Sequence, residues 1–562
     1  MQKWDKEFDV VVFGSGAGGM AAALVCAVHG LTVGVYEKST WYGGTTSNSG
    51  GGVWVPCTSH ALKAGVGDSL EQARQFLQSE LGPHFDADLV DAFLQTGPEA
   101  IAYLEKNSHV AFQLGAIPDY HAEAPGGRTF GRVLFPLPFD ARKLGDGFAQ
   151  LRSPWKRFLV FGGMMVGRRD IPALMRPFAS LANMKYVLSV LLRYAADRLK
   201  FHRGTNVLMG NSLAARLLHS LRERNVFMQN HASVSQLLRA TSGAVVGATV
   251  QTPSGSIQVR ARKAVILATG GFPHSPTLRA KYAGTHPHHH SAAYAESVGD
   301  GLKAATGVGA AVLSDIGSPA FWTPASVLQE RDGSQVVFPY GHLDRGKPGA
   351  IIVNADGKRF VNEADSYHDV VTAMYAGPDV DARLRSHLIC DHTFIRKYGL
   401  GAVRPAPYSL RPFIKLDYLI KEHTLNALAR RIGVNEANFL ASVQEHNSHV
   451  ASGVDPVFHK GKSAFNQYNG DPDCTPNPCL APLQHGPFYA LRIYPATIGT
   501  AAGIKTDANA QVIDTQGRPI AGLYACGNDM ASMMRGFYPG PGITIGPALV
   551  FAYRAATHLA RA

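Results

Sequence analysis

The chain has 562 residues and a net charge of +12, and 46% of its residues are hydrophobic against 17% charged. This length favours three to four domains, and the composition excludes disorder over most of the chain as well as a fibrous or coiled-coil protein. Six cysteines are too few for a disulfide-stabilised scaffold and fit a reducing compartment; they are Cys26, Cys57, Cys390, Cys474, Cys479 and Cys526.

The N-terminal segment reads MQKWDKEFDVVVFGSG, with acidic residues beside its lysines and a predicted strand directly after them. This pattern differs from a secretory signal. The sequence has no run of about 20 uncharged apolar residues that could form a transmembrane helix. We therefore expect a cytoplasmic protein.

The first predicted strand, FDVVVF at 8–13, is an apolar run typical of a buried parallel strand. A glycine-rich turn, GSGAGG at 14–19, and a predicted helix follow, and a second strand ends at Glu37. In this setting the glycines let the backbone approach a pyrophosphate at a helix N-terminus. Glu37 lies about twenty residues further on, where a carboxylate can bond ribose hydroxyls. The segment therefore predicts a dinucleotide site.

Three later segments favour FAD over NAD. The loop 41–56, WYGGTTSNSGGGVWVP, follows the second strand and is rich in the small residues that let backbone amides reach a flavin and its phosphates. The strands in 263–272, KAVILATGGF, and 522–529, GLYACGND, both run into glycine. Because these segments are far apart in the chain, we expect a discontinuous cofactor domain.

The positive charge is concentrated in residues 152–203, which hold eleven arginines and lysines against two acids. Residues 182–201 are predicted to form a helix, with its basic side chains mostly off one apolar stripe. The stripe consists of Met184, Val187, Leu188, Leu191, Leu192 and Ala195. A basic amphipathic helix suits an anionic membrane surface. The alternative is a helix that packs on the body and exposes a solvated basic face. Nucleic acid is disfavoured, because phosphate-binding patches rarely interleave so many large apolar residues.

These motifs together resemble the fumarate reductase/succinate dehydrogenase flavoprotein superfamily. The matching segments are GSGAGG, GGTTSNSGG, ATGGF, GDG (299–301), PGAIIVNADGKRFVNE (348–363), GLYACGN and GPALVFAYRAA. The resemblance implies an α/β fold: a doubly wound, Rossmann-like FAD-binding domain with an inserted α+β capping domain. It also implies non-covalent FAD, because the loop 43–52 lacks the histidine that carries covalent flavin in respiratory members.

The resemblance gives the expected domain boundaries. Residues 1–151, 204–295 and 490–562 form the three parts of the FAD-binding domain. Residues 152–203 form the basic insert, and residues 296–489 form the capping domain. The expected FAD contacts are Gly14, Ser15, Gly16, Ala17, Gly18, Gly19, Glu37, Lys38, Gly44, Thr45, Thr46, Ser47, Gly50, Gly51, Gly52, Ala268, Thr269, Gly270, Gly527, Asn528 and Ile545.

Within the superfamily, the segment 494–507, YPATIGTAAGIKTD, lacks the histidine-rich signature of fumarate reductases. A dicarboxylate would leave its charges unpaired in such a site, at a cost of several kcal/mol. The segment 534–550, MRGFYPGPGITIGPALV, instead resembles 3-ketosteroid Δ1-dehydrogenases. Two more segments match that family: 118–132 with Tyr120, and 359–370 with Tyr367.

That resemblance implies roles for four residues. The Tyr538 hydroxyl and the Gly542 backbone N–H would bind the C3 carbonyl oxygen, as an oxyanion hole does. Tyr367 would take the C2 proton, and Tyr120 would donate a hydrogen bond that stabilises the phenolate, because a phenol of pKa about 10 is otherwise a poor base. The C1 hydride would leave from the opposite face for flavin N5.

The expected function is therefore FAD-dependent 1,2-desaturation of 3-ketosteroids in steroid degradation. A quinone-type or artificial compound would accept the electrons, and a peripheral contact with the inner face of the cell membrane could run through 152–203. The rivals are a 3-ketosteroid Δ4-(5α)-dehydrogenase, a dehydrogenase of another cyclic ketone, and, from a different class, a flavin-binding membrane module without turnover.

Some residues carry weaker expectations. Met533, Met534 and Phe537 line the substrate or belong to the core, and Trp322 and Tyr340 are further candidates for the lining. A histidine cluster is interpreted as a solvated loop rather than a metal site, so no metal is expected. It consists of His286, His288, His289 and His290.

Overall fold

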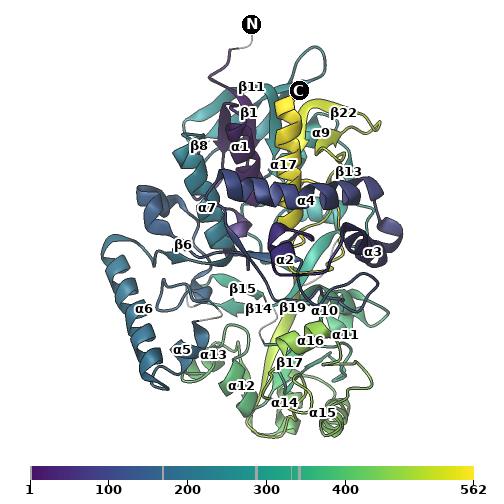
Figure 1. Cartoon of the computed structure of the whole chain (residues 1–562). Helices are drawn as coiled ribbons and strands as arrows, with labels where there is room; N and C mark the ends of the chain where they lie inside the picture. The colour runs from purple at the N-terminus through teal and green to yellow at the C-terminus, as the bar shows by residue number, and fades with distance from the viewer. Residues whose placement is uncertain (1–2, 168–169, 285–288, 331, 340–343, 562) are drawn as a thin grey trace.

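The computed structural model describes residues 3–167, 170–284, 289–330, 332–339 and 344–561. Two large sheets organise it (Figure 1). One sheet lies at the top of the view, near both chain ends, and the other lies in the lower half among the helices of the chain's second half. The long helix α4 (Ala87–Asn107) crosses between them in this view.

The upper sheet has a parallel core, because its central strands are joined by crossovers rather than hairpins. In spatial order the parallel strands are β22 (Pro519–Ala525), β11 (Gly255–Leu267), β1 (Lys6–Phe13), β2 (Val33–Tyr36) and β8 (Phe227–Gln229). Antiparallel strands extend it: β9 (Ser233–Arg239), β10 (Val245–Thr252) and β21 (Gln511–Ile513). Strands from three distant parts of the chain thus meet in one sheet.

The helix α1 (Ala17–Val28) is buried over most of its length because both of its sides are covered. It packs against β1 and β2, the helix α7 (Met209–Glu223) and the C-terminal helix α17 (Ile545–Arg561). Apolar residues of the sheet and of these helices belong to one continuous core. This arrangement confirms the expected fold class, a doubly wound FAD-binding architecture.

The lower sheet forms the centre of the expected cap, between the cofactor strands in sequence. Its main strands are β14 (Ala320–Gln329), β15 (Gln335–Pro339), β16 (Ala350–Val353), β17 (Ser386–Cys390) and β19 (Phe488–Thr500). The helices around it include α10 (Tyr367–Tyr375), α12 (His392–Tyr398), α14 (Leu425–Ile432), α15 (Glu436–Val450) and α16 (Ala464–Asn469). The boundary expected at 489/490 falls inside β19, whose pairing with β14 and β17 continues well beyond it.

The basic insert projects from the side of the molecule as the helix α6 (Leu181–Lys200), one residue offset from the predicted 182–201 (Figure 1). Asp197 of this helix is buried, and its carboxylate accepts a hydrogen bond from the Thr205 backbone N–H at 2.8 Å. Four of the six residues of the expected apolar stripe face outward: Met184, Leu188, Leu192 and Ala195 are exposed. Among the described residues, no helix is both long enough and apolar enough to cross a bilayer.

Candidate active site and cofactor cradle

Three tyrosines from distant segments meet where the two sheets approach each other. The rings of Tyr120 and Tyr538 are stacked, with centroids 5.7 Å apart and planes 14° from parallel. Tyr367, the first residue of α10, lies edge-on to both, at 5.7 Å from Tyr120 and 5.0 Å from Tyr538. The structure therefore brings together the three side chains that the sequence predicts from separate motifs.

Buried polar contacts fix the backbone that carries this cluster. The Tyr120 N–H donates to the Pro539 carbonyl at 2.8 Å, which joins the two loops directly. The neighbouring Asp119 is buried and accepts hydrogen bonds from the Trp54 indole at 2.8 Å and from Arg132 at 3.0 Å. A Cβ at Gly540 would lie 2.9 Å from the Trp54 ring, so glycine is needed there. These contacts make the position of Tyr538 relative to Tyr120 a property of the folded core.

Burial sets the protonation state of the tyrosines. It raises the pKa of Tyr120 and Tyr367 well above the usual value, and that of Tyr538 to about 12. Hydrogen bonds from Tyr367 and Thr544 act against burial and lower the pKa of Tyr538. The hydrogen bond between Tyr120 and Tyr367 raises the pKa of Tyr367, whereas the family resemblance implies that Tyr120 stabilises a Tyr367 phenolate. At neutral pH all three are neutral phenols that can donate hydrogen bonds.

Gly542 ends the loop that carries Tyr538. Its φ of 97° favours glycine, and a Cβ there would lie 2.4 Å from the backbone of Gly52. Its carbonyl accepts a hydrogen bond from the Trp54 N–H at 3.2 Å, and the helix α17 begins three residues later. The predicted donor pair, the Tyr538 hydroxyl and the Gly542 N–H, thus lies at the positive end of a helix, where negative charge is stabilised.

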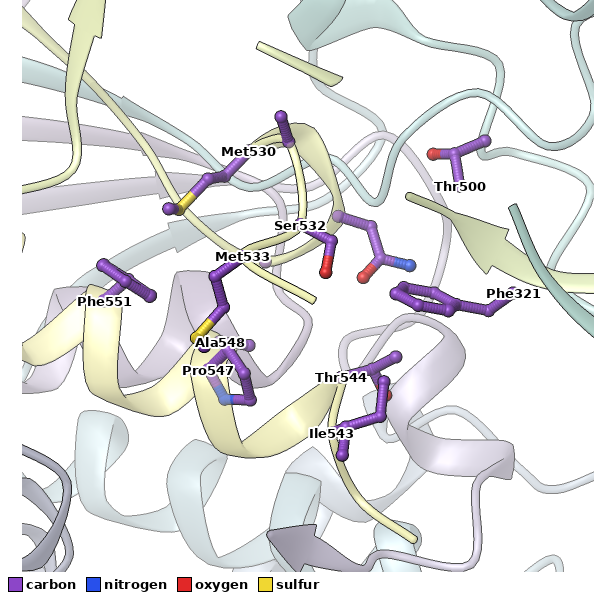
Figure 2. A pocket seen from close by; sticks show the side chains of 13 residues that line it. Phe321, Thr500, Met530, Ser532, Met533, Ile543, Thr544, Pro547, Ala548 and Phe551 are labelled. Atoms are coloured by element: carbon purple, nitrogen blue, oxygen red, sulfur yellow. The ribbon is translucent and has the colours of Figure 1, made fainter. Parts of the chain in front are cut away.

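A cavity adjoins the tyrosines on the side of α17 (Figure 2). Phe321 lines it from β14 and lies edge-on to the Tyr538 ring at 5.4 Å, and Thr544, which is hydrogen-bonded to Tyr538, lines it from below. Every lining residue is neutral, and most are apolar: Phe321, Thr500, Gly527, Asn528, Met530, Ala531, Ser532, Met533, Ile543, Thr544, Pro547, Ala548 and Phe551.

The glycines of the first turn divide into two kinds. Gly14 and Gly19 are packing positions, because a Cβ at Gly14 would lie 2.1 Å from the Ala268 carbonyl oxygen and one at Gly19 would lie 2.0 Å from that of Gly14. Gly16 faces open space, with only the Thr46 hydroxyl within 4 Å of its Cβ position. A dinucleotide-binding turn requires both kinds, because two glycines close the turn and one admits the pyrophosphate.

Further glycines continue the open surface. A Cβ at Gly50 or Gly527 would meet nothing within 4 Å, and one at Gly44 would touch only the Gly16 backbone. The Ser47 hydroxyl is buried without a protein partner among the described residues. An open glycine-lined cradle beside an unsatisfied hydroxyl is the environment that a polar cofactor fills. The residues present therefore fit FAD.

Carboxylates hold the ends of the parallel strands in place. Glu37 accepts hydrogen bonds from the Ser15 hydroxyl at 2.6 Å and the Ser39 N–H at 2.8 Å. Lys38 forms an ion pair at 2.8 Å with Asp300, the first residue of α9 (Asp300–Gly307). The buried Asp529 accepts from the Gly271 N–H at 2.9 Å and from the Thr269 hydroxyl. Thr269 and Gly270 thus lie near Gly527 at the ends of the parallel strands. The segments 263–272 and 522–529 were expected to meet in this way.

The other expected cofactor residues lie along the same edge. The Thr46 hydroxyl accepts from the Ala17 N–H at 3.0 Å, which places the 45–48 turn over the first turn of α1. The remaining expected contacts are buried or partly buried around this turn and the start of α17: Gly18, Thr45, Gly51, Gly52, Ala268, Asn528 and Ile545. The structure contradicts none of these positions, and their contacts with FAD remain predictions.

Several residues beside the tyrosines had no separate signal in the sequence. Thr544 and Phe321 contact Tyr538, and Phe465 from α16 lies 4.5 Å from the Tyr120 ring. His121 directly follows Tyr120 and Asp369 lies two residues after Tyr367, and the two side chains are joined by a hydrogen bond of 3.1 Å. Their proximity could have been expected, because once Tyr120 and Tyr367 meet, their sequence neighbours meet as well.

The weaker expectations have different outcomes. Met533 lines the cavity, whereas Met534 is fully buried in the core. Trp322 is buried beside His289, whose ring lies 5.3 Å away. His289 and its neighbour His290 are partly buried against the capping sheet rather than solvated. Tyr340, His286 and His288 lie outside the described residues.

Comparison with known proteins places the chain in a family. The profile of the FAD binding domain family matches residues 9–545. The chain is 39% identical to 4-oxocyclohex-2-ene-1-carboxylate 5-dehydrogenase of Sinomonas cyclohexanicum, covering 98% of this chain and 94% of that protein. It is 36% identical to 3-oxosteroid 1-dehydrogenase of Mycobacterium tuberculosis, covering 99% and 98%.

A solved structure is similar over the whole chain. It is the 3-ketosteroid Δ1-dehydrogenase of Sterolibacterium denitrificans in complex with 1,4-androstadiene-3,17-dione, with a TM-score of 0.90, 34% identity, and coverage of 99% of this chain and 100% of the other. The resemblance inferred from the motifs is thus confirmed. The chain belongs to the FAD binding domain family of flavoproteins, among the relatives of the 3-oxosteroid 1-dehydrogenases, and is an FAD-dependent oxidoreductase.

Proposed function

We propose that the protein catalyses the 1,2-desaturation of 3-ketosteroids. The observation that carries this proposal is the meeting of Tyr120, Tyr367 and Tyr538 at the neutral cavity beside the start of α17. A ketosteroid is a rigid apolar plate with a carbonyl at one end. Such a molecule needs hydrogen-bond donors at its carbonyl end and apolar side chains along its faces. The tyrosine hydroxyls and Phe321 beside the Tyr538 ring are groups of these kinds.

The donors address the difficult part of the reaction. Removal of a proton from C2 requires negative charge to develop on the C3 oxygen. In this proposal the neutral Tyr538 hydroxyl and the Gly542 N–H donate to that oxygen, and the N-terminus of α17 adds its dipole. Donors held in place by a packed loop require no reorganisation when the charge appears, which makes them effective.

Tyr367 is the proposed base for the C2 proton. Burial raises its pKa, so its phenolate is scarce at neutral pH and strongly basic once formed. The proposal therefore predicts that turnover rises with pH on the alkaline side. The open glycines of the 14–19 turn, the 44–52 loop and Glu37 would hold FAD, which accepts the C1 hydride.

The relatives leave one question of substrate class, because the names of two of them include a carboxylate. An anionic substrate entering a buried site needs a cationic partner. The cavity lining contains no charged residue, but Gly527 and Asn528 in it are also expected FAD contacts, so the neutral donors Tyr538 and Tyr367 carry the argument for a neutral ketone. The substrate of a ketosteroid Δ4-(5α)-dehydrogenase is equally neutral. The two reactions differ only in which carbon atoms lose hydrogen.

The test is anaerobic flavin absorbance with four additions in parallel: androst-4-ene-3,17-dione, 5α-androstane-3,17-dione, 4-oxocyclohex-2-ene-1-carboxylate and no ketone. Bleaching with the first compound, and a new C1–C2 double bond by NMR, is expected. Bleaching with the 5α compound alone, with a C4–C5 product, would assign the rival desaturase. Bleaching by the carboxylate alone would assign a cyclic keto acid, and no bleaching at all would leave the non-catalytic module.

We also propose that the insert contacts an anionic membrane surface. Its outer side exposes large apolar side chains, with Phe178 86% and Leu199 87% exposed, and Lys185 and Arg198 lie on the same exposed helix. One acid of the insert, Asp197, is buried, and the other, Asp170, accepts from the Gly167 N–H at 2.7 Å. Exposed leucines beside basic side chains suit a negatively charged bilayer.

The membrane proposal is tested with point variants. Deletion of 152–203 is unsuitable, because the Arg152 carbonyl accepts from Asn211 and the Trp155 N–H donates to Asn48 beside the cradle. The double variant Leu188→Glu/Leu192→Glu should bind phosphatidylglycerol vesicles more than tenfold more weakly, with flavin content unchanged. Leu62→Glu, at an equally exposed leucine on α2 (Ser59–Lys63), is the matched control. Equal binding by all three proteins would refute the contact.

A further inference from the structure

The loop that carries Tyr120 and the helix that carries Tyr367 are joined by one imidazole. We propose that His121, held between Glu80 and Asp369, is a positioning residue that fixes Tyr120 and Tyr367 relative to each other. This inference rests on the proposed function, because that function assigns Tyr120 and Tyr367 to the reaction. It gives a role to a side chain outside the predicted site. His121 acts through the tyrosines and does not belong to the lining of the cavity.

The geometry uses both nitrogens of the ring. The His121 Nδ1 lies 2.7 Å from the Glu80 Oε2, and its Nε2 lies 3.1 Å from the Asp369 Oδ2. Glu80 belongs to α3 (Leu70–Leu81), which precedes the loop, whereas Asp369 lies in the first turn of α10 in the cap. One side chain thus connects the cofactor-binding part of the molecule to the cap, immediately beside the reacting groups.

Each end of this connection is one or two residues from a tyrosine. Tyr120 immediately precedes His121, and Tyr367 lies two residues before Asp369 at the start of α10. The Ser366 hydroxyl caps this helix by accepting from the Asp369 N–H at 3.2 Å, and it donates to the Asp369 carboxylate at 2.7 Å. A pull on the Asp369 carboxylate is therefore transmitted to the first turn of α10, and so to Tyr367.

Electrostatics keep the connection charged. Burial lowers the pKa of His121, but hydrogen bonds and charge interactions with Asp369 and Glu80 outweigh this and raise it to about 11. The imidazole is therefore a cation that donates from both nitrogens. Other charged groups face the same region: Arg345 and Asp365 lie near Asp369, and the negative charge of Asp369 raises the pKa of Tyr120.

The cation thus has two effects on the tyrosines. It holds their two segments at a fixed distance, and it offsets the carboxylate that disfavours ionisation of the neighbouring phenol. Loss of His121 would leave Asp369 facing Tyr120 without its partner. The side chain is 43% exposed, so its ion pairs contribute little to global stability. Catalysis, rather than melting temperature, is the sensitive measurement.

The experiment compares holoenzyme variants in steady-state and pH-dependent kinetics. His121→Gln keeps a polar side chain but cannot bridge two carboxylates as a cation. We expect kcat to fall between 10- and 100-fold, since misplacement of reacting groups by about 1 Å costs up to 10²-fold. We also expect KM within threefold of wild type, full flavin content, and a rate profile displaced toward higher pH. Asp369→Asn should lower kcat to a similar extent but displace the rate profile toward lower pH, because it removes the carboxylate that raises the pKa of Tyr120. His121→Lys should recover part of the rate.

A matched control is available. His60→Gln removes a similar histidine–carboxylate pair, His60 with Glu105 at 2.8 Å, away from the tyrosines. If His121→Gln and His60→Gln both retain kcat within twofold and an unchanged pH profile, the positioning role is refuted. A loss of flavin or of folding in His121→Gln alone, with normal kcat per bound flavin, would also refute it.

Failure of the proposed function gives a different result. If the wild-type protein is bleached by no ketone, the proposed reaction is wrong, and the connection is then tested by hydrogen exchange. The amides of residues 369–373 at the start of α10 should exchange at least tenfold faster in His121→Gln than in wild type, with no change in the His60→Gln protein. Equal exchange in the three proteins would refute the connection without reference to turnover.

Discussion

In the cofactor cradle, the contacts that shape the turn come from nearby positions, such as the Thr46 hydroxyl and the Ala17 N–H. In the tyrosine cluster, Tyr120, Tyr367 and Tyr538 come from three distant segments, and one of them lies on the cap. The first turn and the 45–48 turn of the cradle are therefore held together by one stretch of the chain, whereas Thr269 and Gly527 complete the cradle from distant segments. The cluster exists only when the two sheets are docked, so it depends on long-range packing.

The comparison separates two kinds of damage. Changes in the cradle should remove flavin and leave the tyrosines assembled, whereas changes in the cluster should keep the flavin and abolish turnover. Flavin content per chain and turnover per bound flavin are the two quantities that distinguish them.

The largest effect on turnover is expected from Tyr367→Phe. Removal of the base that takes the C2 proton should lower kcat by about 10² to 10⁴-fold while the flavin spectrum stays that of wild type. The ring remains, so the edge-on contacts with Tyr120 and Tyr538 persist. The control is Tyr375→Phe at the other end of α10, which should keep wild-type kcat. A Tyr367→Phe protein with undiminished kcat would remove the base from the proposed mechanism.

Tyr538→Phe should lower kcat by about 10² to 10³-fold, the usual cost of one lost oxyanion donor. Stacking of the ring on Tyr120 is unchanged by the substitution, so flavin content and melting temperature should match wild type. Rapid-reaction bleaching isolates the chemical step. An effect confined to KM would instead mean that the hydroxyl binds the ketone without favouring the transition state.

The cradle is tested by a pair of glycine variants. Gly16→Val places a side chain in the open space, so the apoprotein should fold normally and its affinity for FAD should fall at least tenfold. Gly14→Ala creates a clash with the Ala268 carbonyl at a φ of 100°, so the melting temperature itself should fall. Fluorescence titration of FAD and thermal unfolding of the apoproteins measure the two. Wild-type FAD affinity in Gly16→Val would contradict the assignment of that surface.

The smallest expected effect is on stability at high pH. Burial holds the three phenols neutral in the folded chain, whereas unfolded tyrosines ionise from about pH 10. Above that pH the unfolded state binds fewer protons, so the free energy of unfolding decreases as pH rises toward about 12. The stability is fully present below pH 10. Tyr120→Phe should lessen the decrease between pH 10 and 11, which melting curves of the two proteins can measure; identical slopes would contradict it.

The sequence predicts the local elements well because their signals are local. The strand–turn–helix at 8–28 and the helix at 182–201 follow from periodicity and glycine spacing, and α6 differs from its prediction by one residue. The boundary at 489/490 was less accurate, because β19 continues without a break from the cap toward the cofactor edge. No residue in that strand marks the change from one part to the other.

The site was predicted only in part. The motif tyrosines and Gly542 were expected from resemblance, and the structure brings them together. The direction in which Tyr120 shifts the pKa of Tyr367 differs from the expectation, because the hydrogen bond between the two phenols raises the pKa of Tyr367 and lowers that of Tyr120. The contact of His121 with Glu80 had no signal in the sequence, whereas its proximity to Asp369 follows once Tyr120 and Tyr367 meet.

The packing of α17 against α1 has a consequence for the apoprotein. Gly18 in the first turn of α1 lies against the Ala548 carbonyl of α17, and the loop of Tyr538 and Gly542 leads directly into that helix. The first turn of the cradle and the carbonyl-binding loop therefore share one helix, although the folded core holds the loop with or without the cofactor. We expect an apoprotein still to offer its hydrogen-bond donors to the ketone but to be unable to oxidise it.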